Sequence, residues 1–242
     1  MNAPRPSSLV GAASALSVRG LTKSYGARDE DERPALSPLT LEVPAGQLVA
    51  LVGHNGSGKT TFMRMVAGLL DPTGGTVTVF DAARGSIDAR ARLAYLADQP
   101  TFYDDLSLRE HLEYVARMHG VADWLADAER LVAHVGLTER MEQLPTTFSR
   151  GLRQKAAIAL AFVRPFDLLL VDEPFVGLDQ AGKEALLVLF DEAHARGATL
   201  VVATHELSFV HRADRLIALA DGEVRYDGAP GDADVPSLVF HT

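Results

Sequence analysis

The chain has 242 residues, 47% of them hydrophobic, which is enough to bury one large core or one core with a small annex. The formal net charge of −9 argues against the basic surface that nucleic acids require, so we expect no nucleic-acid partner. The sequence contains no cysteine, which excludes disulfides, thiolate metal sites and cysteine nucleophiles.

Residues 1–13 are expected to form a flexible N-terminal tail, ahead of a single folded domain over 14–242. The tail holds Pro4, Pro6 and two serines, and it lacks the basic and apolar regions of a secretory signal. No apolar stretch approaches the roughly 18 residues that a membrane span needs. Any role at a membrane is therefore expected to depend on a partner.

The first elements are predicted to mix strands with a loop. Residues 16–21 and 39–43 have the composition of strands, and the charge-rich segment between them, 27–33, is predicted to be a solvated loop. Residues 47–52 are predicted to be a short buried strand. The helix expected at 61–70 places five apolar side chains on one face: Phe62, Met65, Val66, Leu69 and Leu70.

The segment between that strand and that helix matches the G-x-x-x-x-G-K-[ST] spacing of a phosphate-binding loop. Its residues are Gly53, His54, Asn55, Gly56, Ser57, Gly58, Lys59 and Thr60, with Thr61 next in the helix. Glycines let backbone N–H groups approach phosphate oxygens, and the helix N-terminus favours the same anion. Lys59 is predicted to bind the β- and γ-phosphates, and the Thr60 hydroxyl to bind Mg²⁺.

A turn at 71–75 and a strand at 76–80 follow, and together with the two early strands they predict a β-rich annex. Residues 102–163 are predicted to form an inserted α-helical subdomain. Its first helix begins with the capping-box spacing of Ser107 and Glu110 and stops at Gly120, and two further helices are expected at 124–135 and 152–163.

The chain then returns to an α/β rhythm, which predicts a mainly parallel sheet. A strand is expected at 168–171, a helix at 182–196 and a strand at 199–203. A final hairpin is predicted to turn through Asp221-Gly222.

Two carboxylates, Asp172 and Glu173, follow the strand predicted at 168–171. Parallel strands deliver functional groups at their carboxyl ends, so both acids are candidates for a nucleotide site. Asp172 is predicted to hold the Mg²⁺ shell, and Glu173 to orient the attacking water at the γ-phosphate. The alternative is a strand end that carries two solvated acids.

With both motifs in this order, residues 16–228 closely resemble the nucleotide-binding subunit of the ATP-binding cassette (ABC) transporter family. The resemblance implies an α/β P-loop ATPase core with an antiparallel β annex and an α-helical insert. It also implies further site residues. Tyr25 resembles the adenine platform, Gln99 the glutamine that contacts Mg²⁺ and the attacking water, and His205 the switch histidine.

The family's signature segment, usually Leu-Ser-Gly-Gly-Gln, is similar to Phe148-Ser149-Arg150-Gly151-Leu152. Ser149 and Gly151 keep the family pattern, whereas Arg150 and Leu152 depart from it. Arg150 is predicted either to add charge near the γ-phosphate or to face solvent. Gly177-Leu178-Asp179 resembles the loop that crosses the dimer interface, which makes Asp179 a nucleotide-site candidate.

The resemblance implies a head-to-tail homodimer or heterodimer with two ATP molecules and their Mg²⁺ ions at the interface. It further implies an ATPase that energises a separately encoded membrane permease, docked near residues 102–105, from the cytoplasmic face of the membrane. Export is favoured over import, because the signature segment looks like that of small exporters and the chain ends soon after the hairpin. A soluble ABC ATPase and a nucleotide-gated interaction protein with little turnover are the alternatives.

Overall fold

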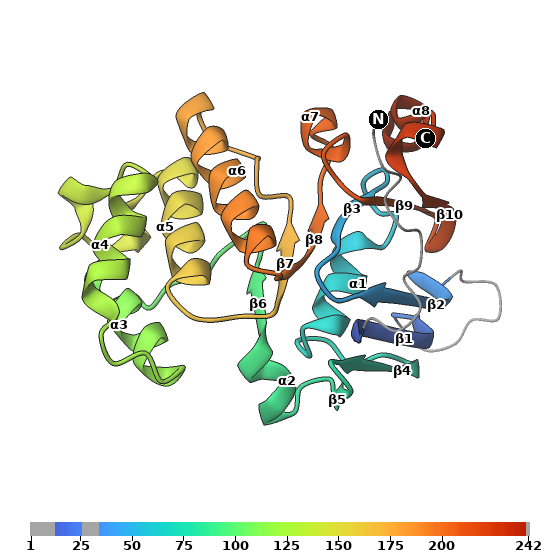
Figure 1. Cartoon of the computed structure of the whole chain (residues 1–242), viewed down its shortest axis with the longest axis horizontal. Helices are drawn as coiled ribbons and strands as arrows, with labels where there is room; N and C mark the ends of the chain where they lie inside the picture. Colours follow the sequence, from blue (N-terminus) through green and yellow to red (C-terminus); the bar gives the residue numbers. More distant parts are fainter. Residues whose placement is uncertain (1–12, 26–33, 241–242) are drawn as a thin grey trace, which may run out of the picture.

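The structure, a computed structural model, describes residues 13–25 and 34–240. Two β-sheets and a group of helices make up the fold (Figure 1). Most of the expected N-terminal tail and the loop expected at 27–33 lie outside the described residues.

The larger sheet has six strands in the order β10-β9-β3-β8-β7-β6, and all neighbours are parallel except β10 and β9. The carboxyl ends of its five parallel strands therefore lie at one edge of the sheet. The strands are β3 (Leu48–Val52), β6 (Leu93–Leu96), β7 (Leu168–Asp172), β8 (Thr199–Ala203), β9 (Arg215–Ala220) and β10 (Glu223–Gly228).

The central strands are buried on both faces because alternate side chains enter two different cores. In β7, Leu169 and Val171 pack in the core beneath the helices, while Leu168 and Leu170 pack in the core shared with the smaller sheet. The continuous apolar runs of the sequence are explained by this two-sided burial.

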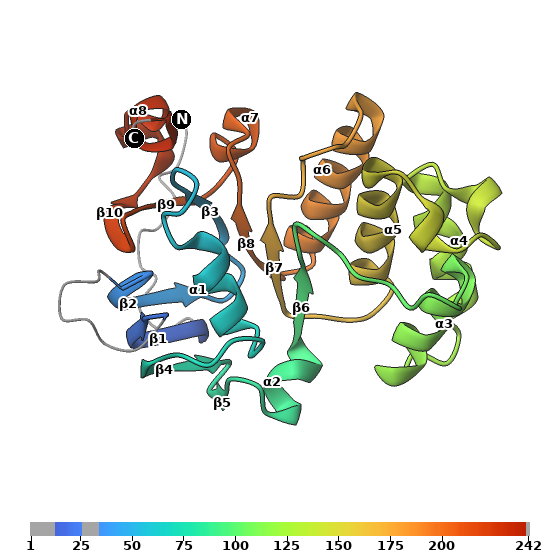
Figure 2. The ribbon, with the colours of Figure 1, turned by 180° about the vertical axis from the view of Figure 1, so that it is seen from behind.

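The smaller sheet is antiparallel, in the order β2-β1-β4-β5, and forms the predicted annex. It lies at the end of the molecule away from the helices of the insert (Figures 1 and 2). Helix α1 (Lys59–Val66) shares its core through Phe62 and Met65. The strands are β1 (Ser14–Lys23), β2 (Leu36–Pro44), β4 (Gly74–Val79) and β5 (Ala82–Ala83).

The predicted insert contains three main helices, α3 (Leu108–Met118), α4 (Trp124–His134) and α5 (Arg150–Phe162). The capping box is present, with the Ser107 amide donating to Glu110 at 2.7 Å and the Glu110 amide donating to the Ser107 hydroxyl. Two 3₁₀ turns, η1 (Thr138–Arg140) and η2 (Pro145–Thr147), connect α4 to α5. The helices pack on the same core as α6 (Gln180–Ala195).

Two local predictions were wrong or incomplete. Helix α1 starts earlier than expected and ends at Val66, because Gly68 follows in the left-handed region (φ 76°), which leaves Leu69 68% exposed. Strand β6, a short strand at the edge of the parallel sheet, was not predicted. The remaining elements are α2 (Ile87–Arg92), α7 (Leu207–Val210), η3 (Pro230–Asp232) and α8 (Val235–Phe240).

The predicted final hairpin is confirmed: Asp221 and Gly222 both have positive φ angles, 51° and 75°, as a two-residue turn of this kind requires. No helix in the described part of the chain combines the length and the apolar run needed to cross a bilayer.

Candidate functional site

The predicted phosphate loop joins β3 to α1 at the carboxyl edge of the parallel sheet. Its glycines are required by the backbone, since Gly53, Gly56 and Gly58 have φ angles of 148°, 86° and 102°. A Cβ at Gly53 would lie 2.1 Å from the Leu219 carbonyl oxygen, and one at Gly58 would lie 2.8 Å from the Ala35 carbonyl oxygen. The phosphate loop therefore packs tightly between β9 and the residue that precedes β2.

Lys59 points back over this loop and links it to the predicted acids. Its Nζ lies 2.6 Å from the Gly53 carbonyl oxygen, 3.3 Å from that of His54 and 3.7 Å from Oε1 of Glu173. The side chain is only 6% exposed. Burial lowers the pKa of the Lys59 ammonium, and the charges of Glu173 and Asp172 oppose this shift.

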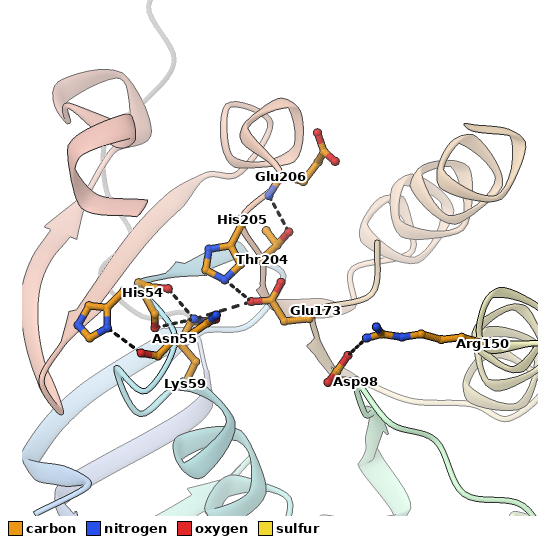
Figure 3. A network of polar contacts seen from close by, with 10 residues as sticks. His54, Asn55, Lys59, Asp98, Arg150, Glu173, Thr204, His205 and Glu206 are labelled. Atoms are coloured by element: carbon orange, nitrogen blue, oxygen red, sulfur yellow. Dashed lines mark hydrogen bonds and ion pairs between the residues drawn. The ribbon is translucent and has the colours of Figure 1, made fainter. Parts of the chain in front are cut away.

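Glu173 lies just past the end of β7 and also meets His205. Oε1 of Glu173 is 2.9 Å from Nε2 of His205, so Lys59, Glu173 and His205 form one network (Figure 3). The Glu173 backbone is in the left-handed region, with φ 48°, and its amide donates to the Ala203 carbonyl oxygen at 2.9 Å. A non-glycine residue held in this region stores strain, which is common at functional sites.

Asp172 is the buried end of β7 and is only 1% exposed. Burial raises the pKa of its carboxyl, the charges of Glu173 and Asp98 act in the same direction, and a hydrogen bond from the Thr60 hydroxyl opposes them. The Tyr95 hydroxyl donates to Oδ2 at 3.4 Å, and burial raises the pKa of this phenol far above its usual range. Tyr95 thus stays protonated beside the acid.

Lys59, Thr60 and Glu173 line a pocket of about 250 Å³, whereas Asp172 and His205 contact this group from outside its lining. Its lining combines backbone of the phosphate loop with two acids, and consists of Ala35, Asn55, Gly56, Ser57, Gly58, Lys59, Thr60, Thr61, Asp98 and Glu173. The arrangement offers donors and a cation on one wall and carboxylates on the other. Such a site suits an anion with a bound divalent cation.

Among the buried oxygens that have no hydrogen-bond partner within the described structure are two at this site, Oδ1 of Asp172 and Oγ of Ser57, besides Oε1 of Glu173 with its ion-pair contacts. Buried polar atoms normally have partners, so these two fit a ligand of the site. The described residues hold no cluster of three or more acidic or histidine side chains that could bind a metal alone. Mg²⁺ that arrives with a nucleotide takes most ligands from phosphate and water, and Thr60 and Asp172 fit the remaining positions.

The geometry agrees with the comparisons to known proteins. The family model described as "ABC transporter" matches residues 36–176. The chain belongs to the ABC transporter family. It is 35% identical to the SkfA peptide export ATP-binding protein SkfE of Bacillus subtilis (strain 168), over 88% of each chain.

Solved structures of ABC proteins share this fold. A structure of an ATP-binding subunit of an ABC transporter is 33% identical and covers 90% of this chain and 91% of that one, with a TM-score of 0.81. A dimeric structure of a bacterial ABC transporter cassette is 25% identical and covers 89% of this chain and 98% of that one, with a TM-score of 0.80. The predicted fold class is confirmed, and the chain is an ABC ATPase.

Within this ABC ATPase, the structure brings together the phosphate loop, Asp172, Glu173 and His205, but it does not bring every candidate to the pocket. Gln99 lines an adjacent groove of about 760 Å³. Tyr25 is 55% exposed, with Nζ of Lys23 5.3 Å from the ring centre.

Ser149, Gly151 and Asp179 also lie outside the lining of the phosphate pocket. Ser149 caps α5, and its hydroxyl accepts from the Leu152 amide at 3.4 Å. Asp179 caps α6 through the Gly182 amide at 2.9 Å and pairs with Lys155 at 2.8 Å. Their predicted contacts with nucleotide would thus have to be made across an interface.

The sequence reasoning missed Asp98, which lines the phosphate pocket and pairs with Arg150 at 3.2 Å. Arg150 was predicted either to add charge near the γ-phosphate or to face solvent; its side chain is 59% exposed, and the contact with Asp98 was not part of either prediction. The sequence does show an acid, Asp98, directly before Gln99. Where Asp98 lies in the fold depends on strand β6, which was not predicted.

Replacing Gly53 by alanine is expected to destabilise the fold by about 2–5 kcal/mol, because a Cβ clash is added to left-handed backbone strain. Gly197→Ala is the matched control: φ is 88° there, but the added Cβ meets nothing within 4 Å. We expect the control to cost only about 1–2 kcal/mol. Urea unfolding of both variants measures the difference in the free energy of unfolding. Equal losses of this free energy in the two variants would contradict the tight packing of the loop at Gly53.

Proposed function

We propose that the chain is the ATP-binding and ATP-hydrolysing subunit of a transporter whose membrane permease is a separate chain, and that it acts in export. The network of Lys59, Glu173 and His205 beside the phosphate loop carries this proposal. A cation, a carboxylate and a histidine around one anion pocket match the needs of in-line phosphoryl transfer to water.

Each residue has a role that follows from its place. The loop amides and Lys59 bind the phosphates, Thr60 and Asp172 hold Mg²⁺, and Mg²⁺ supplies charge neutralisation at the transferred phosphoryl group. Glu173 accepts the proton of the attacking water, and His205 orients Glu173 through their 2.9 Å contact. Tyr25, which is exposed, would stack on the adenine, and Gln99, in the groove beside the pocket, would contact the Mg²⁺ and the attacking water.

Two copies, or this chain and a second ABC ATPase, complete the sites between them. Ser149 and Gly151 stand at the start of α5, where Ser149 is exposed, and both lie outside the chain's own phosphate pocket. Asp179 directly precedes α6, in the segment that follows β7, and is also outside that pocket. The solved dimeric ABC cassette supports this arrangement.

The permease is proposed to dock at the groove after Gln99, which places the chain on the cytoplasmic face of the membrane. The groove is adjacent to the phosphate pocket, and Asp98 lines both the groove and the pocket. A partner seated in the groove would therefore contact the segment that also borders the nucleotide. Export is supported by the likeness to the peptide export protein SkfE.

Affinity purification of the tagged chain from detergent-solubilised native membranes tests the proposal. We expect an integral membrane protein to co-purify, and phosphate release from ATP to rise when the two are reconstituted together. A chain that stays in the soluble fraction and hydrolyses ATP equally well without a membrane protein would support a soluble ABC ATPase instead. Binding of ATP without turnover in either form would support a nucleotide-gated interaction protein.

A further inference from the structure

Arg150, the first residue of α5, contacts a segment distant in the sequence. Its Nη2 donates to Oδ1 of Asp98 at 3.2 Å, across 52 positions of sequence, and Figure 3 shows the side chain extended from α5 toward Asp98. Asp98 directly precedes Gln99. The ion pair therefore joins the signature segment of this chain to the segment that carries Gln99.

The stem of Arg150 lies against a third segment, the loop after β7. A Cβ at Gly177 would lie 3.5 Å from Cγ and 3.6 Å from Cδ of Arg150. The next residue of α5 packs on the same loop, since a Cβ at Gly151 would lie 2.4 Å from the Gly177 carbonyl oxygen. One side chain thus contacts the loop that follows Glu173 and, through Asp98, the segment before Gln99.

Asp98 connects the contact with Arg150 to the phosphate pocket. Asp98 lines the phosphate pocket together with Lys59 and Glu173, and it also lines the groove that contains Gln99 and Arg150. A change in the groove can therefore reach the phosphate pocket through a single residue. The pair is partly exposed, with Arg150 59% and Asp98 32% accessible, and such pairs are weak enough to open and re-form.

We propose that Arg150 is a positioning residue for ATP hydrolysis: through Asp98 it holds the Gln99 segment, and through its stem it holds the Gly177 loop, at the start of α5. This inference rests on the proposed function for the role of Gln99 in turnover. The contacts themselves do not depend on that function. Breaking the link is expected to loosen both segments while the phosphate loop keeps its structure.

Amide hydrogen exchange of the full chain tests the link without reference to catalysis. Arg150→Ala is expected to raise exchange at least about threefold in peptides covering 97–103 and 176–179. Peptides of the phosphate loop should be unchanged. Asp98→Asn should reproduce the effect in the first of these peptides.

Arg130→Ala is the matched control. Arg130 is an exposed arginine of α4 that joins the insert to α6, with Nη1 3.7 Å from Glu192, and it is 53% accessible. The Arg130→Ala substitution removes the same charge from the same group of helices as Arg150→Ala, but at a position away from Gln99. If Arg130→Ala raised exchange in the same peptides as Arg150→Ala, or if neither variant did, the inference would be overturned.

Steady-state phosphate release, measured with ATP and Mg²⁺, gives a second readout. Arg150→Ala and Asp98→Asn are each expected to lower kcat about fivefold, with KM changed less than about twofold. Because Arg150→Ala already removes the contact with Asp98, the double variant should be no slower than Arg150→Ala alone. Arg130→Ala should keep the kcat of the unmodified chain.

A rival role for Arg150, direct contact with the nucleotide of the facing copy, gives different results. It predicts a raised KM for Arg150→Ala and losses that multiply in the double variant, and that pattern would overturn the inference. If the unmodified chain releases no phosphate, the proposed function fails, and the exchange experiment still decides the link. Normal turnover with unchanged exchange in Arg150→Ala would sink the inference alone.

Discussion

Glu173→Gln is expected to lower ATP hydrolysis at least about a hundredfold while ATP binding persists. Glutamine has nearly the same shape, so it can keep the left-handed backbone at φ 48° and the space beside His205. It cannot accept a proton at neutral pH, which removes the proposed base. Steady-state phosphate release gives the rate, and calorimetry with ATP and Mg²⁺ gives the affinity.

Asp167→Asn is the control for this change, because Asp167 lies just before the opposite end of β7, where it pairs with Arg92 at 2.5 Å. It removes the same charge next to the same strand, far from the phosphate loop, and should leave turnover unchanged. Normal hydrolysis by Glu173→Gln would show that Glu173 is not the base.

The same variant also reports on the proposed dimer. If ATP held between two copies favours the closed pair, a chain that cannot hydrolyse ATP should accumulate as a dimer with ATP and Mg²⁺, and as a monomer without them. Size-exclusion chromatography with light scattering measures this. A monomer under both conditions would contradict a self-complementary pair and leave the heterodimer as the assembly to test.

The sequence predicted best those features that arise from local patterns. The spacing around Gly53 and Lys59 required a strand on one side and a helix on the other, and the structure has both. The two acids after the run 168–171 were placed correctly, because a buried parallel strand can end only at the carboxyl edge of its sheet. Capping and turn residues such as Ser107 and Gly222 fixed element ends for equally local reasons.

What the sequence could not provide depends on contacts between distant segments. Strand β6 has four residues, too few to show a period, and it is recognisable only by its pairing with β7. Asp98 and Gln99 follow that strand, so their positions were open as well. The pairing of Arg150 with Asp98 could not be predicted either, because it depends on how β6, which precedes Asp98, lies relative to α5, which begins at Arg150.

Lys59→Ala is expected to weaken ATP binding about tenfold to a hundredfold, since a charge-assisted contact with phosphate contributes about 1.5–3 kcal/mol. The fold should lose little stability, because the ammonium is buried at a cost that lowers its pKa, and removing it relieves that cost. Lys183→Ala is the control: this lysine pairs with Glu206 at 2.7 Å and does not line the pocket. Titration calorimetry with ATP and Mg²⁺ gives both affinities. An affinity for Lys59→Ala equal to that of the control would mean that the backbone amides and Mg²⁺ hold the phosphates without the lysine.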